Sequence, residues 1–330
     1  MQKIAFIGTG GTMSSLGLDA LDIVDYGAQQ HRLDAAEILA AIPEALAVAD
    51  VFAVKFTQVL SFSIAYKDWR ALVKLCAELV AQHPDLGGIV IGHGTATLEE
   101  TAYFLNLTLK IDIPVVVVGS QRPLSGLSSD AKMNFVNAVR VAAAPESRGR
   151  GVLVLLNDEI HAAREVTKTA TFRLQTFRAP DFGMLGYVDG PVVAYYRNAI
   201  RKSAPDTEFD IAALDELPRV DIVYSYAGAD GAAIEAFVAA GARGIVSAGF
   251  APGSPTPEQA EALVRAREAG VVVLQSTRVG SGIVHGGKKS REQGFIPADN
   301  LNPQKARLLL ALALTRTTDP TEIARMFQTY

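Results

Sequence analysis

Short apolar runs, several of them bounded by glycine, recur along this chain and constrain its fold more than any other feature. They lie at residues 4–7, 88–91, 115–118, 152–156, 221–224, 244–248 and 271–274. Longer stretches with helical spacing separate several of these runs. Strands that alternate with helices form a mostly parallel sheet with helices packed on its faces. The sequence therefore predicts an α/β fold built from mostly parallel sheets.

The chain is also long enough to contain more than one hydrophobic core. It has 330 residues, whereas a single core seldom organises more than about 250–300. Residues 196–218 are polar, contain Pro205 and Asp206, and have little periodicity, as expected of a connection. We predict a large N-terminal α/β domain over residues 1–195, a linker over 196–218 and a smaller α/β domain over 219–330.

Composition narrows the classes of partner. The formal net charge is −4 and basic residues form no block, which argues against nucleic acid or an anionic membrane surface as partner. No apolar run approaches the ~20 residues of a membrane span. The first apolar run starts at residue 4 and is too short for a signal peptide, so we expect a cytoplasmic protein with a small-molecule substrate.

Cysteine and histidine usage argues against a metal or redox site. Cys76 is the single cysteine and lies in an apolar helical pattern, so we expect it in the core. The five histidines have no paired spacing of the kind that metal sites use. We therefore expect no metal site.

Hydroxyl and glycine residues follow two of the predicted strands. The first strand runs into the sequence GTGGT at residues 8–12, and the second into HGTAT at residues 93–97. Ligands bind at the carboxyl ends of parallel strands, where glycines such as Gly8 and Gly94 let a substrate approach the backbone. The glycine spacing of a nucleotide loop is absent, which leaves a nucleophile or a plain tight turn. Thr97 and Glu100 also fit a structural capping box.

Four segments, in this order along the chain, resemble the motifs of a known protein family. They are TGGT at residues 9–12, HGT followed by LEETAYFL within 93–105, Asp158 with REVTK at 164–168, and LNPQKAR at 301–307. Together they resemble the bacterial L-asparaginase/glutaminase family over nearly the whole chain. The resemblance implies a large and a small α/β domain, amide hydrolysis by threonine without metal or cofactor, and a homotetramer. That tetramer would be a dimer of intimate dimers, with active sites between paired subunits.

The resemblance also implies catalytic roles. Thr9 corresponds to the nucleophilic threonine, and Thr95 and Lys168 to the proton-transfer pair. Tyr26, on a candidate lid over residues 14–32, is assigned as the activating tyrosine. A threonine hydroxyl needs such a neighbour to become a nucleophile, and a lysine acts as base only if its pKa is lowered, for example by burial.

The substrate-binding positions depart from the family pattern. Ala96 stands where the motif HGTDT has an aspartate that contacts the substrate's α-ammonium, and Phe62 replaces a polar ammonium contact. Ser61 keeps the serine that binds the substrate carboxylate. The glutamate that reaches across from the partner subunit has no clear counterpart. Ser254 and His285, the latter on a glycine-rich stretch, are the expected polar groups at this end of the pocket.

These departures favour hydrolysis of a small amide or cyclic imide that lacks a free α-ammonium, through an acyl-enzyme. Two alternatives remain at this point. In the first, the chain is an ordinary L-asparaginase, which includes one inactivated by an Asp-to-Ala change at position 96. In the second, it is a non-catalytic member of the family that only binds a small ligand. A single inactivating change would leave the other ammonium contacts intact, and they are altered as well. Release of ammonia or amine by the purified protein separates enzyme from binding protein.

Overall fold

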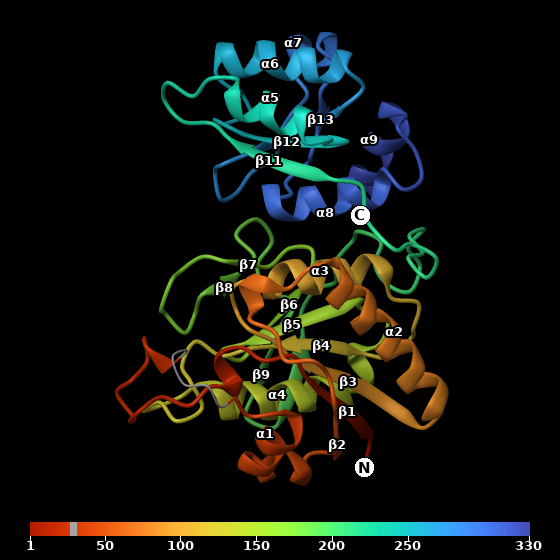
Figure 1. Ribbon diagram of the computed structural model, residues 1–330. Helices are drawn as coiled ribbons and strands as arrows, with labels where there is room; N and C mark the ends of the chain where they lie inside the picture. The colour runs from red at the N-terminus through yellow and green to blue at the C-terminus, as the bar shows by residue number, and fades with distance from the viewer. Residues whose placement is uncertain (27–31) are drawn as a thin grey trace. The chain divides into compact units, whose positions relative to one another are not determined.

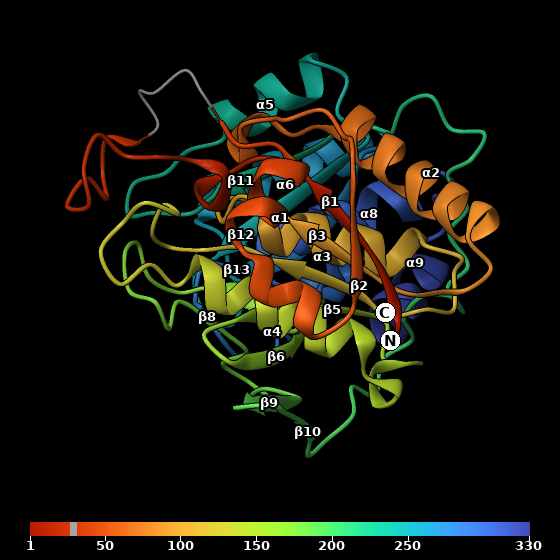
Figure 2. The same cartoon turned by 90° about the horizontal axis from the view of Figure 1, so that it is seen from below.

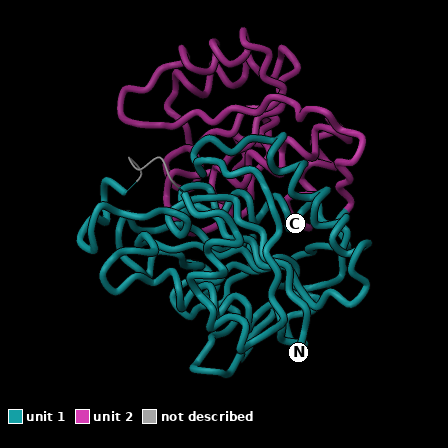
Figure 3. Tube along the Cα trace, turned by 60° about the horizontal axis from the view of Figure 1, so that its bottom comes forward, with its two compact units in different colours: residues 1–207 teal, residues 208–330 magenta. Residues whose placement is uncertain are grey.

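The chain forms two compact units, Met1–Thr207 and Glu208–Tyr330 (Figure 3). The computed structural model describes residues 1–26 and 32–330. The division between the units lies inside the stretch 196–218, for which the sequence predicts a linker. Each unit is an α/β structure with its own sheet, so the predicted α/β class with mostly parallel sheets is confirmed.

The sheet of the first unit has the strand order β10-β9-β6-β5-β4-β3-β1-β2. β1 to β5 pair with one another in parallel, whereas β6, β9 and β10 at the other edge pair antiparallel, β6 also with β5. Their bounds are β1 (Lys3–Gly8), β2 (Asp50–Val54), β3 (Leu86–Gly92), β4 (Val115–Val118), β5 (Val152–Leu156), β6 (Glu159–Ala162), β9 (Gly186–Asp189) and β10 (Val192–Tyr195). β7 (Thr167–Lys168) and β8 (Phe177–Arg178) form a separate antiparallel pair.

Helices cover both faces of this sheet, which is why its central strands are continuously apolar. Ile4 and Phe6 of β1 pack with α1 (Ala35–Ala41) and α4 (Ala131–Ala143), whereas Ala5 and Ile7 face α2 (Tyr66–Gln82) and α3 (Leu98–Thr108) (Figure 1). Cys76 of α2 is fully buried, and burial raises the pKa of its thiol to about 12, in agreement with its predicted place in the core. Short 3-10 helices are η1 (Thr12–Ser14), η3 (Pro43–Ala47), η4 (Ser61–Ser63) and η5 (Pro145–Ser147).

The antiparallel edge begins at a tight hairpin after β5. Asn157 and Asp158 connect β5 to β6 and have φ values of 51° and 65°. Two consecutive residues with positive φ are typical of a type I′ turn, whose twist matches that of an antiparallel pair. The chain therefore reverses directly at this point instead of crossing over through a helix.

The second unit has a parallel sheet in the order β11-β12-β13-β14. The strands are β11 (Val220–Tyr224), β12 (Gly244–Gly249), β13 (Val272–Thr277) and β14 (Ile296–Pro297). α5 (Ala232–Ala239) and α6 (Pro257–Glu268) cover one face and α8 (Pro303–Ala313) the other, with α7 (Lys288–Glu292) and α9 (Pro320–Thr329) at the periphery (Figure 1). Within the described parts of both units, no helix is long and apolar enough to cross a membrane.

Candidate active site

The two glycine- and threonine-containing segments leave the first sheet at the same edge. β1 and β3 are parallel neighbours (Figure 2), with Gly8 opposite Gly92. The amide of Thr9 still donates to the carbonyl of Gly92, at 2.9 Å, before the chain turns away. Since ligand sites in open α/β sheets form at the carboxyl ends of parallel strands, this edge is the candidate active site.

Glycines allow the two turns to pack backbone against backbone. Gly11 has a φ of 91°, and a Cβ built on it would lie 2.2 Å from the Cα of Gly94. A Cβ on Gly94 would in turn lie 2.6 Å from the Oγ of Ser61, so the predicted carboxylate-binding serine lies beside the HGTAT segment. Gly8 packs differently, because its Cα faces Ala35 at the start of α1. Gly94 therefore packs against Gly11 and Gly8 against a helix, and the approach of a substrate to Gly8 and Gly94 stays a prediction.

The Thr97 hydroxyl ties the Ser61 segment to the start of α3. It donates to the carbonyl of Ser61 at 2.6 Å and does not cap the helix that follows. The capping box considered from the sequence is thus not formed through Thr97. This bond holds the segment around Ser61 and Phe62 against the end of β3.

His93 lies beneath the site and supports it. It is buried, and burial lowers its pKa to about 4, so the ring is neutral near neutral pH. Its Nδ1 lies 2.8 Å from the carbonyl of Gly94, and its Nε2 lies 2.9 Å from the hydroxyl of Thr101. Thr101 also accepts a hydrogen bond from the indole of Trp69 at 2.8 Å. A neutral ring with hydrogen on Nδ1 satisfies all these contacts, which identifies His93 as a structural residue.

Thr95 and Lys168 meet as the sequence predicts. The ammonium or amine nitrogen of Lys168 donates to the Thr95 hydroxyl at 2.7 Å. Burial lowers the pKa of Lys168, while the carboxylate of Glu99 acts in the opposite direction. Glu99 is only 6% exposed and accepts a hydrogen bond from the backbone amide of Lys168 at 3.1 Å. The pair can therefore transfer a proton once the lysine is neutral.

Tyr26 contacts Thr12 and not Thr9. Its hydroxyl lies 3.0 Å from the Thr12 hydroxyl. The Thr9 hydroxyl instead donates to the carbonyl of Gly92 at 3.0 Å, and this residue is 2% exposed. The tyrosine hydroxyl thus lies beside Thr12, which the sequence reasoning passed over, and not beside the Thr9 that is predicted as nucleophile. Residues 27–31, the rest of the candidate lid, lie outside the described residues.

One signal in the sequence distinguishes the two threonines. Thr9 directly follows β1, so its backbone is still in the sheet and its hydroxyl bonds to the neighbouring strand. Thr12 follows Gly10 and Gly11, both with positive φ, which turn the chain out of the sheet. A residue after such a turn has left the hydrogen-bonded ladder, whereas one before it is still held by it.

Comparison with known protein families agrees with this arrangement. Residues 3–201 match the family model described as "Asparaginase, N-terminal", and residues 219–327 match "Glutaminase/Asparaginase C-terminal domain". The chain belongs to the asparaginase/glutaminase family. The resemblance drawn from the four sequence segments is thereby confirmed.

Several members of the asparaginase/glutaminase family are similar over the full chain. An L-asparaginase 2 of Bacillus subtilis is 42% identical, with 100% of this chain and 87% of the relative covered. A glutaminase-asparaginase of Pseudomonas fluorescens is 38% identical, with 100% and 91% covered. The crystal structure of a probable cytoplasmic L-asparaginase from Campylobacter jejuni is 39% identical, covers 100% of both chains and has a TM-score of 0.95. This family member is therefore an amidohydrolase that acts on C–N bonds.

Of the positions at which the chain departs from the asparaginase motif, Ala96 lies on the same pocket wall as Lys168. Ala96 and Lys168 line an open pocket of about 860 Å³ in the first unit. Phe62 is 72% exposed. Ser254 and His285 belong to the second unit, where backbone bonds between Phe250 and Ser254 close a tight turn. Their predicted roles in substrate binding stay predictions.

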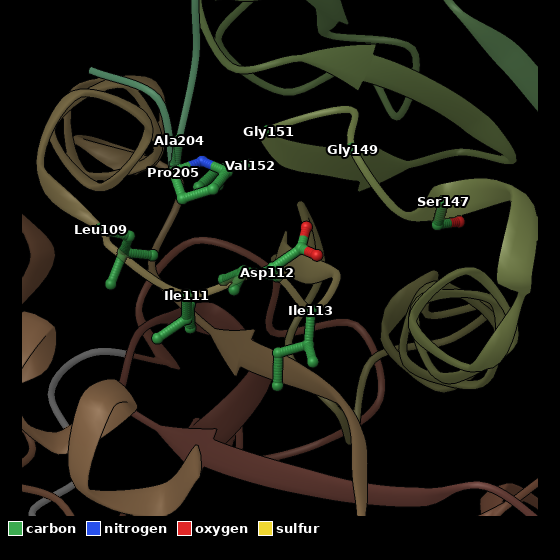
Figure 4. Close-up of a pocket in the computed structure, with 11 residues that line it drawn as sticks. Leu109, Ile111, Asp112, Ile113, Ser147, Gly149, Gly151, Val152, Ala204 and Pro205 are labelled. Atoms are coloured by element: carbon green, nitrogen blue, oxygen red, sulfur yellow. The ribbon is translucent and has the colours of Figure 1, made fainter. Parts of the chain in front are cut away.

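The described residues contain no cluster that could hold a metal ion, and one further cavity is too small for a substrate. Across residues 1–26 and 32–330, no cluster of three or more His, Cys, Asp or Glu side chains is placed to hold a metal ion. A small cavity lies among Leu109, Ile113, Val152 and Pro205, at the amino ends of β4 and β5 (Figure 4). Its volume of about 10 Å³ has room for about one water molecule. It is too small for an amide substrate and lies at the opposite edge of the sheet.

Proposed function

We propose that this family member hydrolyses a small amide or cyclic imide without a free α-ammonium, and that Thr12 is its nucleophile. The observation that carries the proposal is the pairing of Tyr26 with Thr12, at 3.0 Å, at the same sheet edge as the Lys168–Thr95 pair, at 2.7 Å. The two pairs supply a hydroxyl nucleophile and a base, which are the groups that two-step acyl transfer requires.

In the first step, the Thr12 oxygen attacks the substrate carbonyl. The Tyr26 hydroxyl accepts the Thr12 proton and gives its own proton to the leaving nitrogen, so ammonia departs and an ester to Thr12 remains. In the second step, neutral Lys168 accepts a proton through Thr95 from the attacking water. That proton returns to the Thr12 oxygen as the carboxylic acid leaves. The lowered pKa of Lys168 supports this role, because it enlarges the neutral fraction near neutral pH.

The lining of the site supports a substrate without ammonium. Ala96 and Phe62 offer a methyl group and a phenyl ring where the family uses polar or acidic contacts. Glu99 also lines the pocket, but its carboxylate is buried and is bound by the amide of Lys168. Hydrogen bonds to charged groups contribute about 1.5–3 kcal/mol each. Loss of two such contacts therefore weakens binding of an ammonium by about 3–6 kcal/mol, or ~10²–10⁴-fold.

The experiment compares kcat/KM for L-asparagine and for succinamic acid, the same molecule without the α-ammonium, on one preparation. We expect succinamic acid to equal or exceed asparagine. A much higher kcat/KM for asparagine would identify the chain as an ordinary asparaginase. If none of the tested amides releases ammonia, the result would favour the alternative of a protein that only binds a ligand. The homotetramer and the cytoplasmic location expected from the sequence stay predictions.

A further inference from the structure

The pocket beside Ala96 is larger than a four-carbon amide requires. Its volume of about 860 Å³ falls in the range of about 300–1,000 Å³ that is typical of sites for much larger ligands. Ala96 and Lys168 lie on its wall, so the pocket adjoins the groups assigned to the reaction. Ala96 is also the position at which the family places its ammonium-binding carboxylate. The pocket therefore includes the position at which that charge would otherwise stand.

Residues 169–173, which follow Lys168 directly, line the pocket as a loop that is fixed by hydrogen bonds. The amide of Thr169 donates to the carbonyl of Thr176 at 2.7 Å, and the amide of Ala170 donates to the Thr176 hydroxyl at 3.0 Å. The side chain of Gln121 donates to the carbonyls of Thr171 and Arg173, both at 3.2 Å. The loop thus has a defined shape and presents its side chains at fixed positions.

This loop adds an aromatic ring and a cation to the pocket. Phe172 lines the pocket and is 61% exposed, so its ring is available for apolar contact. Arg173 follows it on the same wall. Among the residues that the structure describes, no carboxylate lies within ion-pair distance of the Arg173 guanidinium. The inner acid, Glu99, is already bound by the amide of Lys168. The pocket therefore favours a ligand that is apolar along its length and anionic at its end.

We infer that the substrate is an N-acylated asparagine whose acyl group ends in a carboxylate, with N-succinyl-L-asparagine as the simplest probe. Acylation removes the positive charge of the α-nitrogen, so no counter-charge is needed at position 96. The acyl group passes the methyl of Ala96 and the ring of Phe172, and its carboxylate pairs with Arg173. The reaction breaks the C–N bond of the terminal carboxamide and consumes water, and it releases ammonia and the N-acyl-aspartate. The inference rests on the proposed function and names its substrate class.

The first test is a series of substrates on the unmodified enzyme, with ammonia release as the readout. Succinamic acid, N-acetyl-L-asparagine and N-succinyl-L-asparagine are compared by kcat/KM. N-succinyl-L-asparagine adds to the N-acetyl compound a methylene, which contributes about fourfold when buried, and a carboxylate. An exposed ion pair adds about two- to fivefold. We expect the N-succinyl compound to exceed the N-acetyl compound about tenfold and to match or exceed succinamic acid.

The second test locates the carboxylate. Arg173→Gln should lower the ratio of kcat/KM for N-succinyl-L-asparagine to that for N-acetyl-L-asparagine by about two- to fivefold. Arg178→Gln is the matched control, since Arg178 is an exposed arginine of the neighbouring β8 that does not line the pocket. It should leave the ratio unchanged. An unchanged ratio in Arg173→Gln, or an equal fall in both variants, would overturn the contact with Arg173.

The outcomes separate this inference from the proposed function. Rapid hydrolysis of succinamic acid with N-acyl-asparagines more than tenfold poorer would overturn the inference and leave the proposed function standing. Hydrolysis of asparagine with poor turnover of all the ammonium-free compounds would overturn both. Preference for the N-acetyl over the N-succinyl compound would reject the anionic end of the proposed substrate.

Discussion

Replacing each threonine of the GTGGT turn by valine should affect kcat and stability in opposite ways. Valine keeps the shape of threonine and removes only the hydroxyl. Thr12→Val removes the proposed nucleophile and also the 3.0 Å contact with Tyr26. We expect kcat to fall at least ~10³-fold with little change in melting temperature, because loss of a nucleophile removes the covalent step itself.

Thr9→Val should show the reverse pattern. The lost hydrogen bond is the 3.0 Å contact from the Thr9 hydroxyl to the carbonyl of Gly92. That carbonyl keeps the amide of Thr9 at 2.9 Å, so it is not left without a partner. The cost is then that of one ordinary hydrogen bond, about 0.5–1.5 kcal/mol of stability. We expect a slightly lower melting temperature and kcat within about tenfold of the unmodified enzyme.

The assay is ammonia release from succinamic acid, with circular dichroism and thermal melting on each variant to verify folding. Incubation with substrate followed by mass spectrometry provides a second readout, since the acyl group should be found on the peptide that contains Thr12. Near-normal turnover by a folded Thr12→Val variant, together with an inactive Thr9→Val, would refute the reasoning. In that case the Thr9 hydroxyl would have to break its hydrogen bond to the carbonyl of Gly92 during catalysis.

Four further outcomes follow from the structure. Lys168→Met should lower kcat ~10²–10⁴-fold and abolish the rise of activity with pH, which in the unmodified enzyme should begin below the ordinary lysine pKa of 10.5 because burial lowers it. Ala96→Asp should shift preference toward L-asparagine and move that rise to higher pH, because a new carboxylate near Lys168 favours its charged form. Gly11→Ala should lower the melting temperature far more than Gly149→Ala, since both have positive φ but only the first places its Cβ against Gly94, at 2.2 Å. Sedimentation should detect at least a two-fold symmetric dimer, and a monomer that is fully active at nanomolar concentration would contradict the predicted assembly.

The sequence predicted the parts of the fold that depend on local pattern. Buried parallel strands are continuous apolar runs, so the positions of β1, β3, β4 and β5 could be read directly. The antiparallel edge was missed, because its strands are short and partly exposed. Asn157 and Asp158, adjacent residue types that tolerate positive φ, were the available signal for the hairpin that begins this edge.

The site was predictable to the level of segments and not of atoms. The family resemblance paired Thr95 with Lys168, and the two side chains meet at 2.7 Å. Gly10 and Gly11 were the local signal that separates Thr9 from Thr12, but the contact of Tyr26 with Thr12 could not be read from that pattern. The loop that carries Phe172 likewise takes its shape from distant Gln121. Contacts of this kind carry no local pattern, so they require the folded structure.

The loss of the aspartate at position 96 links substrate charge to the proton chemistry of the site. A carboxylate there would serve an ammonium-bearing substrate, but it would also stabilise the charged form of Lys168. With Ala96 in its place, Glu99 is the carboxylate that raises the pKa of Lys168, and burial outweighs it. A substrate without ammonium needs no counter-charge, and its absence leaves the base more often neutral. Under the proposed function, the same substitution therefore disfavours an ammonium-bearing substrate and favours the neutral form of the base that hydrolysis requires.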